Sequence, residues 1–391
     1  MRILFIAMSN SIHTARWISQ ITSPEFDIHL FPSIDLGLIH EELKDVTVYH
    51  SFFQLQKNIQ QKVILKGIPL HTAGRDDFLK SIIKKCLPLY RSQQLRYLIK
   101  KLKPDIIHSL ETQSSGYLML EVGRKLHWRL PSWIHTIWGS DIFYFGQFND
   151  HEKKIREVFG HCNFLITDCQ RDITLARQYG FCGTFLGVFP GQGGFDIATM
   201  NKYRQSGLVS QRNKIIIKGY QGWAGRALVV LKALEQCINL LQKYELIFYL
   251  TSPEVRREAT FLAQRYSLNI KIIPPTHNET ILKTMGGSRI SIAMNITDGV
   301  PNSLLESMIM GAFPIQSDTI SVREWIKPDV NGFLVNPNET HSLAAKLRQA
   351  LRDDELVDRA AYLNGNLTSQ RIDQKIIKPR VVSMYKKIVP E

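Results

Sequence analysis

Short apolar runs alternate with longer segments of helical periodicity along most of the chain. This alternation is typical of βαβ units, in which helices join parallel strands and cover the sheet. In the first half, the apolar runs predict strands at Ile3–Ala7, Asp27–Phe31, Asp105–His108, Trp133–Ile137 and Asn163–Thr167. The second half repeats the pattern, with strands predicted at Lys214–Lys218, Glu245–Leu250, Asn269–Ile273, Ile290–Ala293, Ala312–Gln316 and Gly332–Val335.

A loop rich in glycine and polar residues separates the two halves and runs from Pro190 to about Arg212. Because such residues mark loops and turns, we interpret this segment as a linker. The pattern therefore predicts an α/β protein with two Rossmann-like, doubly wound domains that face each other across a cleft. The first domain is expected over residues 1–195 and the second over 213–368, with ligands at the carboxyl ends of their strands.

Composition narrows the class of protein. The chain has 391 residues, of which 44% are hydrophobic and 21% charged, as in ordinary globular proteins. This excludes wholesale disorder and collagen-like repeats, and no apolar run approaches the ~18 residues of a membrane span. The first residues, MRILFIAMSNSIH, have too short an apolar core for a signal peptide and are interpreted as a strand. We therefore expect a soluble, cytoplasmic protein.

The cysteines argue against two further classes. There are five, widely spaced and without a C-x-x-C pair: Cys86, Cys162, Cys169, Cys182 and Cys237. Neither a disulfide framework nor a zinc site is expected from this spacing.

The net charge is +14, from 49 basic and 35 acidic residues. Such an excess suggests nucleic acid, an anionic membrane surface or negatively charged substrates as partners. It is densest in the segment 80–103, KSIIKKCLPLYRSQQLRYLIKKLK, where apolar residues recur at helical spacing with basic residues between them. This helix could lie on an acidic lipid surface, or its apolar stripe could pack on its own sheet. No nucleic-acid-binding motif is present, so nucleic acid is not expected.

The segment DGVPNSLLESMIMGAFPI, which starts at Asp298, carries the most informative chemistry. It predicts a turn followed by a helix that begins near Asn302 and ends at Gly311. The free N–H groups at such a helix start form an anion site. Glu306 cannot bind the phosphate itself, because like charges repel, but it could accept hydrogen bonds from a ribose diol. The alternative is that neither acid binds a ligand: Asp298 would then be only a carboxylate at the start of the helix, and Glu306 only a surface glutamate.

Asp298 and Glu306, separated by seven residues, resemble the E-x7-E signature of retaining glycosyltransferases of family 4, which have the GT-B fold. Five other segments resemble motifs of the family, and of its members that build surface polysaccharides, in the same order along the chain: MRILFIAMSNSIHTARWI, PDIIHSL, WGSDI, VFPGQGGFD and SVREWIKPDVNGFLV. The six matches cover the chain from Met1 to about Pro337.

The resemblance implies a nucleotide-sugar donor bound by the second domain and a glycan or lipid-linked acceptor bound by the first. It assigns donor binding to Gly299, Asn302, Ser303, Leu304, Glu306, Arg226, Lys218 and Tyr220. Catalysis is assigned to Asp298, Arg226, Glu306, His108 and Asp141. Arg226 matches the position of the family's lysine, and Tyr220 falls near the expected arginine. The resemblance also implies that the tail, 369–391, packs back on the first domain, and that neither a metal nor a cofactor is needed.

The chain departs from the family at Trp138, where relatives have a histidine that faces the donor sugar. Tryptophan can stack on a sugar but cannot shuttle protons. His135 lies three residues earlier and faces the other side of its strand. His13, Arg16 and Trp138 are expected to line the cleft with His108 and Asp141. Packed structural roles stay open for His13 and His108, and capping of the turn at Gly139 stays open for Asp141.

The sequence thus predicts a retaining, metal-independent glycosyltransferase of surface polysaccharide or glycolipid biosynthesis, peripheral to the cytoplasmic face of a membrane. A nucleotide-sugar epimerase and a non-catalytic GT-B partner subunit are the alternatives. A dinucleotide oxidoreductase is disfavoured, because no G-x-G-x-x-G follows the first strand.

Overall fold

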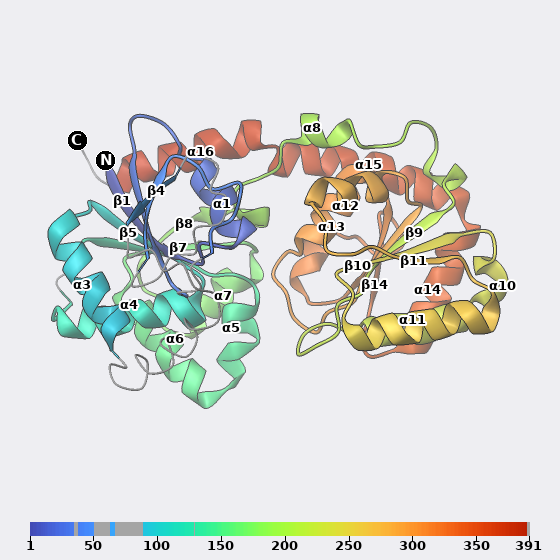
Figure 1. Cartoon of the computed structure of the whole chain (residues 1–391), viewed down its shortest axis with the longest axis horizontal. Helices are drawn as coiled ribbons and strands as arrows, with labels where there is room; N and C mark the ends of the chain where they lie inside the picture. The colour runs from blue at the N-terminus through green and yellow to red at the C-terminus, as the bar shows by residue number, and fades with distance from the viewer. Residues whose placement is uncertain (35–37, 51–62, 67–88, 129, 389–391) are drawn as a thin grey trace. The chain divides into compact units, whose positions relative to one another are not determined.

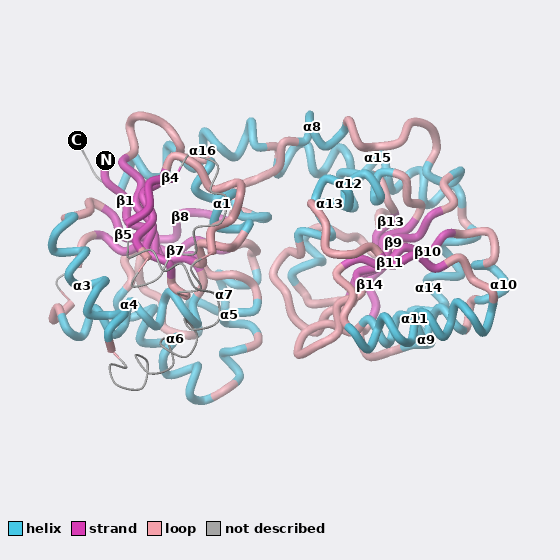
Figure 2. The backbone as a smooth tube through the Cα atoms, in the orientation of Figure 1, coloured by secondary structure: helices cyan, strands magenta, loops and turns pink. Residues whose placement is uncertain are grey.

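The structure is a computed structural model that describes residues 1–34, 38–50, 63–66, 89–128 and 130–388 (Figure 1). The chain divides into two compact units. The first consists of Met1–Gly194 with Ile377–Glu391, and the second of Phe195–Ile376. Each unit contains a parallel sheet with its own helices (Figure 2), so the predicted α/β class and the doubly wound topology are confirmed.

The sheet of the first unit has the strand order β4-β3-β2-β1-β5-β6-β7-β8. Its strands are β1 (Arg2–Ala7), β2 (Asp27–Pro32), β3 (Val46–Tyr49), β4 (Val63–Lys66), β5 (Ile106–Leu110), β6 (Ser132–Thr136), β7 (Phe164–Thr167) and β8 (Thr184–Val188). The helical segments are α1 (Ile12–Ser19), α3 (Tyr90–Leu102), η1 (Thr112–Gly116), α4 (Tyr117–Lys125), α5 (Ser140–Phe143), η2 (Phe145–Gln147), α6 (Asn149–His161), α7 (Arg171–Gln178) and η3 (Pro190–Gln192). The five predicted strands are present, whereas β3, β4 and β8 were not predicted.

Strand β1 shows why the first unit has helices on both faces of its sheet. Because side chains alternate along a strand, Ile3 and Phe5 enter a core shared with α1 and with the last helix, α16 (Gln374–Ile388). Leu4 and Ile6 enter a second core, shared with α3, α4 and α6. A central strand that is buried on both faces forms a continuous apolar run, and in β1 this run is Ile3–Ala7, whose five residues are all buried.

The second unit has the strand order β11-β10-β9-β12-β13-β14. All neighbouring strands are parallel, and the point at which successive strands start to be added on the other side of the sheet lies between β9 and β12. Its strands are β9 (Lys214–Lys218), β10 (Glu245–Tyr249), β11 (Ile270–Ile272), β12 (Ile290–Ala293), β13 (Phe313–Ser317) and β14 (Phe333–Val335), at the six predicted places. Its helical segments are α8 (Ile197–Asn201), η4 (Val209–Gln211), α9 (Ala227–Glu235), α10 (Ile238–Leu241), α11 (Pro253–Tyr266), α12 (Asn278–Gly286), α13 (Asn302–Met310), η5 (Ser321–Glu324), α14 (Thr340–Arg352) and α15 (Asp354–Ile372). Helices α9, α11 and α14 pack in one core against the sheet, and α12 and α13 cover its other face (Figure 2).

Two segments differ from the expected domain boundaries, which were 1–195, 213–368 and a tail at 369–391. The stretch 195–212 belongs to the second unit, where the backbone N–H of Ser210 donates to Asp358 of α15 at 2.9 Å. The tail joins the first unit only from Ile377 onward. There Tyr385 is fully buried, and its hydroxyl accepts a hydrogen bond from Nε1 of Trp17 at 2.8 Å.

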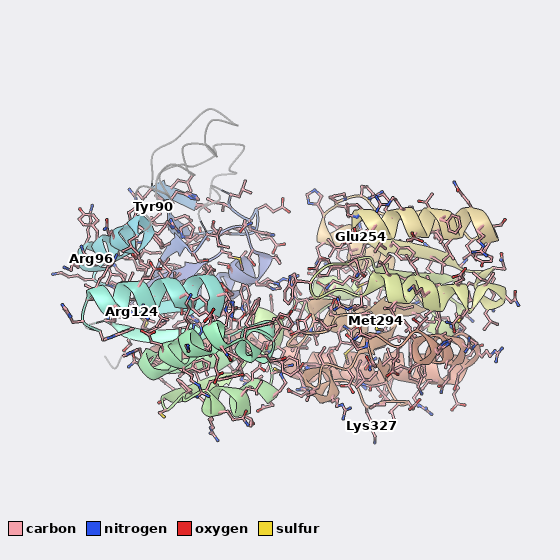
Figure 3. The ribbon with its side chains drawn as sticks, turned by 90° about the horizontal axis from the view of Figure 1, so that it is seen from below. Tyr90, Arg96, Arg124, Glu254, Met294 and Lys327 are labelled. Atoms are coloured by element: carbon pink, nitrogen blue, oxygen red, sulfur yellow. The ribbon has the colours of Figure 1, made fainter. Side chains whose placement is uncertain are left out.

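The basic helix predicted over 80–103 is described from Leu89 onward, and Lys80–Pro88 lies outside the described residues. Leu95, Leu98 and Ile99 of α3 are buried in the core of the first unit, so its apolar stripe packs on its own sheet. The outer face of α3, the helix of Arg96 in Figure 3, instead exposes Tyr97, Lys100 and Lys101. Within the described residues, no helix is both long enough and apolar enough to span a bilayer.

Candidate active site

Two loops meet where the strand order of the second unit reverses. The loop after β9 covers residues 219–226, and the loop after β12 covers 294–301. The N–H of Arg226 donates to the carbonyl of Met294 (labelled in Figure 3), and the N–H of Ile296 donates to Ala224, both at 2.9 Å. In doubly wound sheets, ligands bind at this switch point, outside the carboxyl ends of the strands. Both segments that carry the predicted donor-binding residues therefore converge on one place.

Glycines shape the loop after β9, because it folds closely on its surroundings. A Cβ atom on Gly219 would lie 2.7 Å from Oγ1 of Thr251, and one on Gly225 would lie 2.2 Å from the carbonyl oxygen of Tyr220. The Tyr220 ring packs against Gly225 and Gly222. Tyr220 is therefore half-buried against its own loop, and in this structure it holds the turn.

Arg226 and Lys218 supply positive charge at the switch point. Arg226 Nη1 donates to the carbonyl of Gly225 at 2.8 Å, and Nε donates to Oδ1 of Asn338 at 3.2 Å. Its Nη2 donates no hydrogen bond to any residue that the structure describes. Lys218 ends β9, is half-buried, and makes neither a hydrogen bond nor an ion pair within the same residues. Both side chains thus retain donors for an anion.

Helix α13 begins at Asn302 and ends before Gly311, as predicted. Gly311 has a φ of 79°, which favours glycine as a helix stop. In the first turn, the N–H of Leu304 donates to the carbonyl of Pro301 at 3.0 Å. The prediction that the Leu304 amide binds the diphosphate is therefore wrong for this structure, because the helix already uses that donor. The N–H of Ser303 has no acceptor among the described residues and is the amide available there.

Glu306 is 7% exposed and accepts a hydrogen bond from Nδ2 of Asn278 at 3.3 Å. Burial raises the pKa of Tyr249, and the neighbouring Glu306 charge raises it further. The surface-glutamate alternative is thus wrong, because the carboxylate lies in a polar group with Tyr249 and Asn278. The sequence analysis missed both neighbours. Tyr249 could have been found because it ends a strand at the switch-point edge, whereas Asn278 begins α12 and carries no such signal.

Asp298 and Gly299 are tied into the loop after β12. Asp298 Oδ1 accepts from the N–H of Gly299 at 3.0 Å, and Oδ2 accepts from Nδ2 of Asn295 at 3.4 Å. The carbonyl of Gly299 accepts from Oγ of Ser321 at 2.6 Å. These contacts hold the Asp298 carboxylate at the lip of the turn that precedes α13, eight residues before Glu306.

In the first unit, His13 and Trp138 lie together. Helix α1 is capped by Ser11, whose Oγ accepts the N–H of His13 at 3.2 Å. The His13 and Trp138 ring centroids are 5.2 Å apart. The two side chains come from segments after β1 and β6, whose carboxyl ends share one edge of the sheet. Arg16 follows one turn later on α1 and is half-buried.

His108 does not line a site. It lies in the middle of β5 with no exposed surface, its Nδ1 2.5 Å from the Tyr385 hydroxyl and its Nε2 2.7 Å from Oγ1 of Thr136. Burial holds the pKa of His108 well below its usual value, so the ring is neutral. The predicted catalytic role is wrong, because the side chain faces the core. The alternative left open for His108, a packed structural role, is the one that the structure shows.

Asp141 is 4% exposed, and its Oδ2 accepts the N–H groups of Trp138 and Thr112, both at 2.9 Å. It thus caps the turn before α5. A second carboxylate, which the sequence analysis missed, is that of Glu111, a buried residue with a φ of 76° directly after β5. Burial raises the pKa of both acids, and the charge of Glu111 raises that of Asp141 further. The position of Glu111 at the end of a strand was the sequence signal by which this residue could have been found.

One group among the described residues could hold a metal ion: Asp168, Cys169 and Asp172. All three are buried in the first unit. Asp172 already forms an ion pair with Nε of Arg171 at 2.7 Å. The positive charge of Arg171 thus already balances one of the two carboxylates in this group.

Both halves of the chain match models of known protein families. Residues 2–167 match the family model described as glycosyl transferase 4-like, and residues 201–364 match that of glycosyl transferases group 1. A search of curated proteins found no match.

Solved structures share the fold over nearly the whole chain. Sucrose-phosphate synthase from Thermosynechococcus elongatus is 13% identical with a TM-score of 0.72, and 99% of each chain is covered. Anabaena HepE in complex with UDP-glucose is 15% identical with a TM-score of 0.68, covering 99% of this chain and 100% of HepE. Staphylococcus aureus TarM, in a complex containing α-GlcNAc-glycerol and UDP, is 14% identical with a TM-score of 0.61, covering 76% of this chain and 58% of TarM. Since glycosyl transferase family models match both halves of the chain and these structures share its fold, the chain belongs to the glycosyltransferases of the GT-B fold.

Proposed function

We propose that the protein is a retaining glycosyltransferase of family 4 that transfers a sugar from a nucleotide-diphosphate donor to a glycan or lipid-linked acceptor. The observation that carries the proposal is the buried Glu306 on α13, at the switch point of the second unit. The same switch point carries the helix-start amide of Ser303 and two side-chain cations, Lys218 and Arg226. This combination suits a ribose next to a diphosphate. Surface polysaccharide or glycolipid biosynthesis is the process that we propose for it.

The second unit, in this proposal, binds the donor. Glu306 accepts hydrogen bonds from the ribose diol, while the Ser303 amide, Lys218 and Arg226 bind the diphosphate. Asp298 contacts the donor sugar. HepE is described with UDP-glucose and TarM with UDP, so a uridine donor is the first to test.

The reaction breaks the bond between the anomeric carbon and the diphosphate oxygen and forms a bond to an acceptor hydroxyl. The acceptor proton passes to the departing phosphate. Lys218 and Nη2 of Arg226 stabilise the negative charge that develops on the leaving group, which is the larger part of such catalysis. We propose that these side chains take the place of a metal ion.

The first unit binds the acceptor in this proposal. Trp138 offers an apolar ring and a single N–H donor, which suits stacking on a sugar. The imidazole that family members carry at this position is replaced by His13, whose ring lies beside Trp138. The buried Asp141 sets the position of the Trp138 backbone, because its carboxylate accepts the N–H of Trp138.

We further propose that the protein works at the cytoplasmic face of a membrane. The exposed basic face of α3, with Lys100 and Lys101, suits attraction to anionic lipids rather than insertion into the bilayer. This would bring the enzyme to a lipid-linked acceptor.

The proposal is tested by incubating the protein with UDP-sugars, with and without lipid-linked acceptors, and analysing products by NMR. An α-linked product from an α-linked donor is expected. A β-linked product would contradict retention. Conversion of the nucleotide sugar without an acceptor would indicate the epimerase, and donor binding without turnover would indicate a non-catalytic partner subunit, the reading that Trp138 favours.

A further inference from the structure

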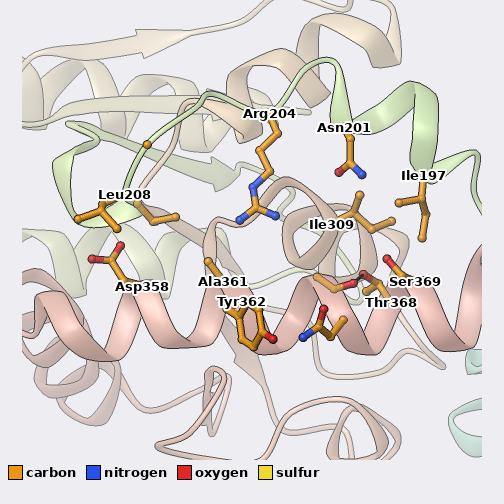
Figure 4. Close-up of a pocket in the computed structure, with 14 residues that line it drawn as sticks. Ile197, Asn201, Arg204, Leu208, Ile309, Asp358, Ala361, Tyr362, Thr368 and Ser369 are labelled. Carbon is orange, nitrogen blue, oxygen red and sulfur yellow. Dashed lines mark hydrogen bonds between the residues drawn. The ribbon is translucent and has the colours of Figure 1, made fainter.

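A pocket of about 320 Å³ lies within the second unit, beside Ile309 in the last turn of α13 (Figure 4). Its walls are α8 with the loop that follows, the C-terminal end of α13, and α15. Glu306 lies in the middle of α13, three residues before Ile309, which corresponds to roughly 4.5 Å along the helix axis at ~1.5 Å per residue. The lining of the pocket includes none of the donor-site residues described above, such as Arg226, Ser303 and Glu306, so we treat it as a separate cavity.

Arg204 extends from the loop after α8 into this pocket, toward α15 (Figure 4). It is half-buried, and its guanidinium makes no hydrogen bond or ion pair with any residue in the described ranges. Two glycines give it room. A Cβ atom on Gly311 would lie 2.9 Å from its Cζ, and one on Gly365 would lie 3.5 Å from its Nη1.

A structural role at the end of α13 does not account for Arg204, because another arginine fills that role. Nη1 of Arg212 donates to the carbonyls of Met310 and Ser288, both at 3.2 Å. Burial, together with repulsion from Arg204, lowers the pKa of Arg212 to about 10. Arg212 is thus a neighbouring cation that does not line the pocket, whereas Arg204 lines it and has its guanidinium donors uncommitted within the described residues.

The acid on the pocket wall does not neutralise Arg204. Asp358 accepts the backbone N–H of Ser210 at 2.9 Å and its hydroxyl at 2.7 Å, so its carboxylate holds η4 to α15. In Figure 4 it lies at the Leu208 end of the pocket. Exposed Asn201, Asn366 and Ser369 add hydrogen-bonding groups to the lining.

We propose that this pocket binds a small phosphate-bearing molecule, whose phosphate pairs with the Arg204 guanidinium. Arginine presents a planar fork of donors that matches phosphate oxygens, and a half-buried guanidinium without a partner gains most from such a ligand. The volume is at the lower end for small-molecule sites, which suits a phosphorylated polyol or phosphate itself. Helix α13 joins this pocket to the donor site, so its occupant can bias the position of Glu306. The binding itself does not depend on the proposed function.

The test is calorimetric titration of the whole chain with glycerol 3-phosphate and with inorganic phosphate, with glycerol as the control ligand. Arg204→Gln is expected to weaken binding about tenfold or more, through loss of a charge-assisted hydrogen bond. Arg257→Gln removes the same charge from an exposed position of α11 and is expected to bind like the wild type. Tighter binding of glycerol 3-phosphate than of phosphate would identify an organic ligand, and equal binding would identify phosphate itself.

A second variant covers the case in which Arg204→Gln does not fold. Ser369→Leu, at an exposed position of α15, is expected to narrow the pocket and weaken binding of the same probes. Loss of binding in Arg226→Ala but not in Arg204→Gln would place the probe at the donor site and overturn the proposal. Absence of binding by the wild type at millimolar probe would also overturn it.

Discussion

Glu306 shows how one residue acquires its function from its surroundings. Its carboxylate is nearly buried beside Tyr249 and receives a hydrogen bond from Asn278. Burying a charge costs free energy unless polar partners compensate. A site with such an acid and a helix-start amide, that of Ser303, which has no acceptor among the described residues, is prepared for a ligand with both hydroxyl and phosphate groups.

Glu306→Gln is predicted to weaken UDP binding by about 2 kcal/mol, roughly thirtyfold in Kd, because a neutral amide replaces a charged acceptor. The amide oxygen can still accept from Asn278, so the melting temperature should change little. Calorimetric titration with UDP measures the loss. The matched control is Glu258→Gln, an exposed glutamate of α11 that should leave Kd unchanged. Equal affinity of both variants would refute the assignment of Glu306.

Arg226→Ala is predicted to lower kcat for sugar transfer at least about tenfold, because the developing phosphate charge loses a cation. Lys218→Ala is the companion variant, since both cations lie at the switch point. Steady-state kinetics with a UDP-sugar separates them. If Arg226→Ala showed normal kinetics while Lys218→Ala was impaired, the stabilisation of the leaving-group charge would be assigned to Lys218 instead.

At the scale of elements, α16 returns the end of the chain to the first unit. Tyr385 occupies a fully buried position, where its hydroxyl bonds both Trp17 and His108. Ile377 and Val381 add apolar contacts to the same core. The helix is therefore part of the first unit's structure rather than a loose terminus.

Tyr385→Phe is predicted to lower the free energy of unfolding by about 1–3 kcal/mol, because the buried polar atoms of Trp17 and His108 each lose a partner. Urea denaturation followed by circular dichroism measures the change. Tyr97→Phe removes the same hydroxyl from a side chain that is 66% exposed and should have little effect. Equal stability of the two variants would show that the buried hydroxyl contributes nothing.

The elements were more predictable from sequence than the side chains of the site. Strands such as β9 and β12 are short, mainly apolar segments, so their positions follow from the burial of those residues. Strand β4 lies at the sheet edge with two of its four residues exposed and the other two half-buried, and it gave no such signal. The role of His108 depends on Tyr385, 277 residues later, a contact that no local pattern encodes.

At the scale of the whole molecule, the charge of +14 suits a protein whose substrates and surroundings are anionic. Of the two alternatives for this basic helix, the described residues of α3 show the one in which the apolar stripe packs on its own sheet. The part of α3 that a membrane surface could contact is its exposed face with Lys100 and Lys101. The attraction of these cations to anionic lipid weakens as the salt concentration rises.

Replacing both Lys100 and Lys101 by glutamate is therefore predicted to weaken binding to vesicles containing phosphatidylglycerol at least about tenfold, at ~1 kcal/mol for each lysine. Vesicles of phosphatidylcholine alone should bind neither form. The control variant, Lys232→Glu with Lys243→Glu, makes the same charge change at exposed positions of the second unit. Cosedimentation measures the binding. Equal losses for both variants would assign the effect to net charge rather than to α3.

The central claim is that the second unit binds a nucleotide-diphosphate sugar at its switch point. Thermal unfolding of the whole chain with a panel of nucleoside diphosphates and nucleotide sugars tests it most directly, because a ligand that binds only the folded state raises the melting temperature. We predict a rise with one nucleotide, larger with one of its sugars, and lost in Glu306→Gln. No rise with any member of the panel, or a rise that Glu306→Gln leaves unchanged, would contradict the claim.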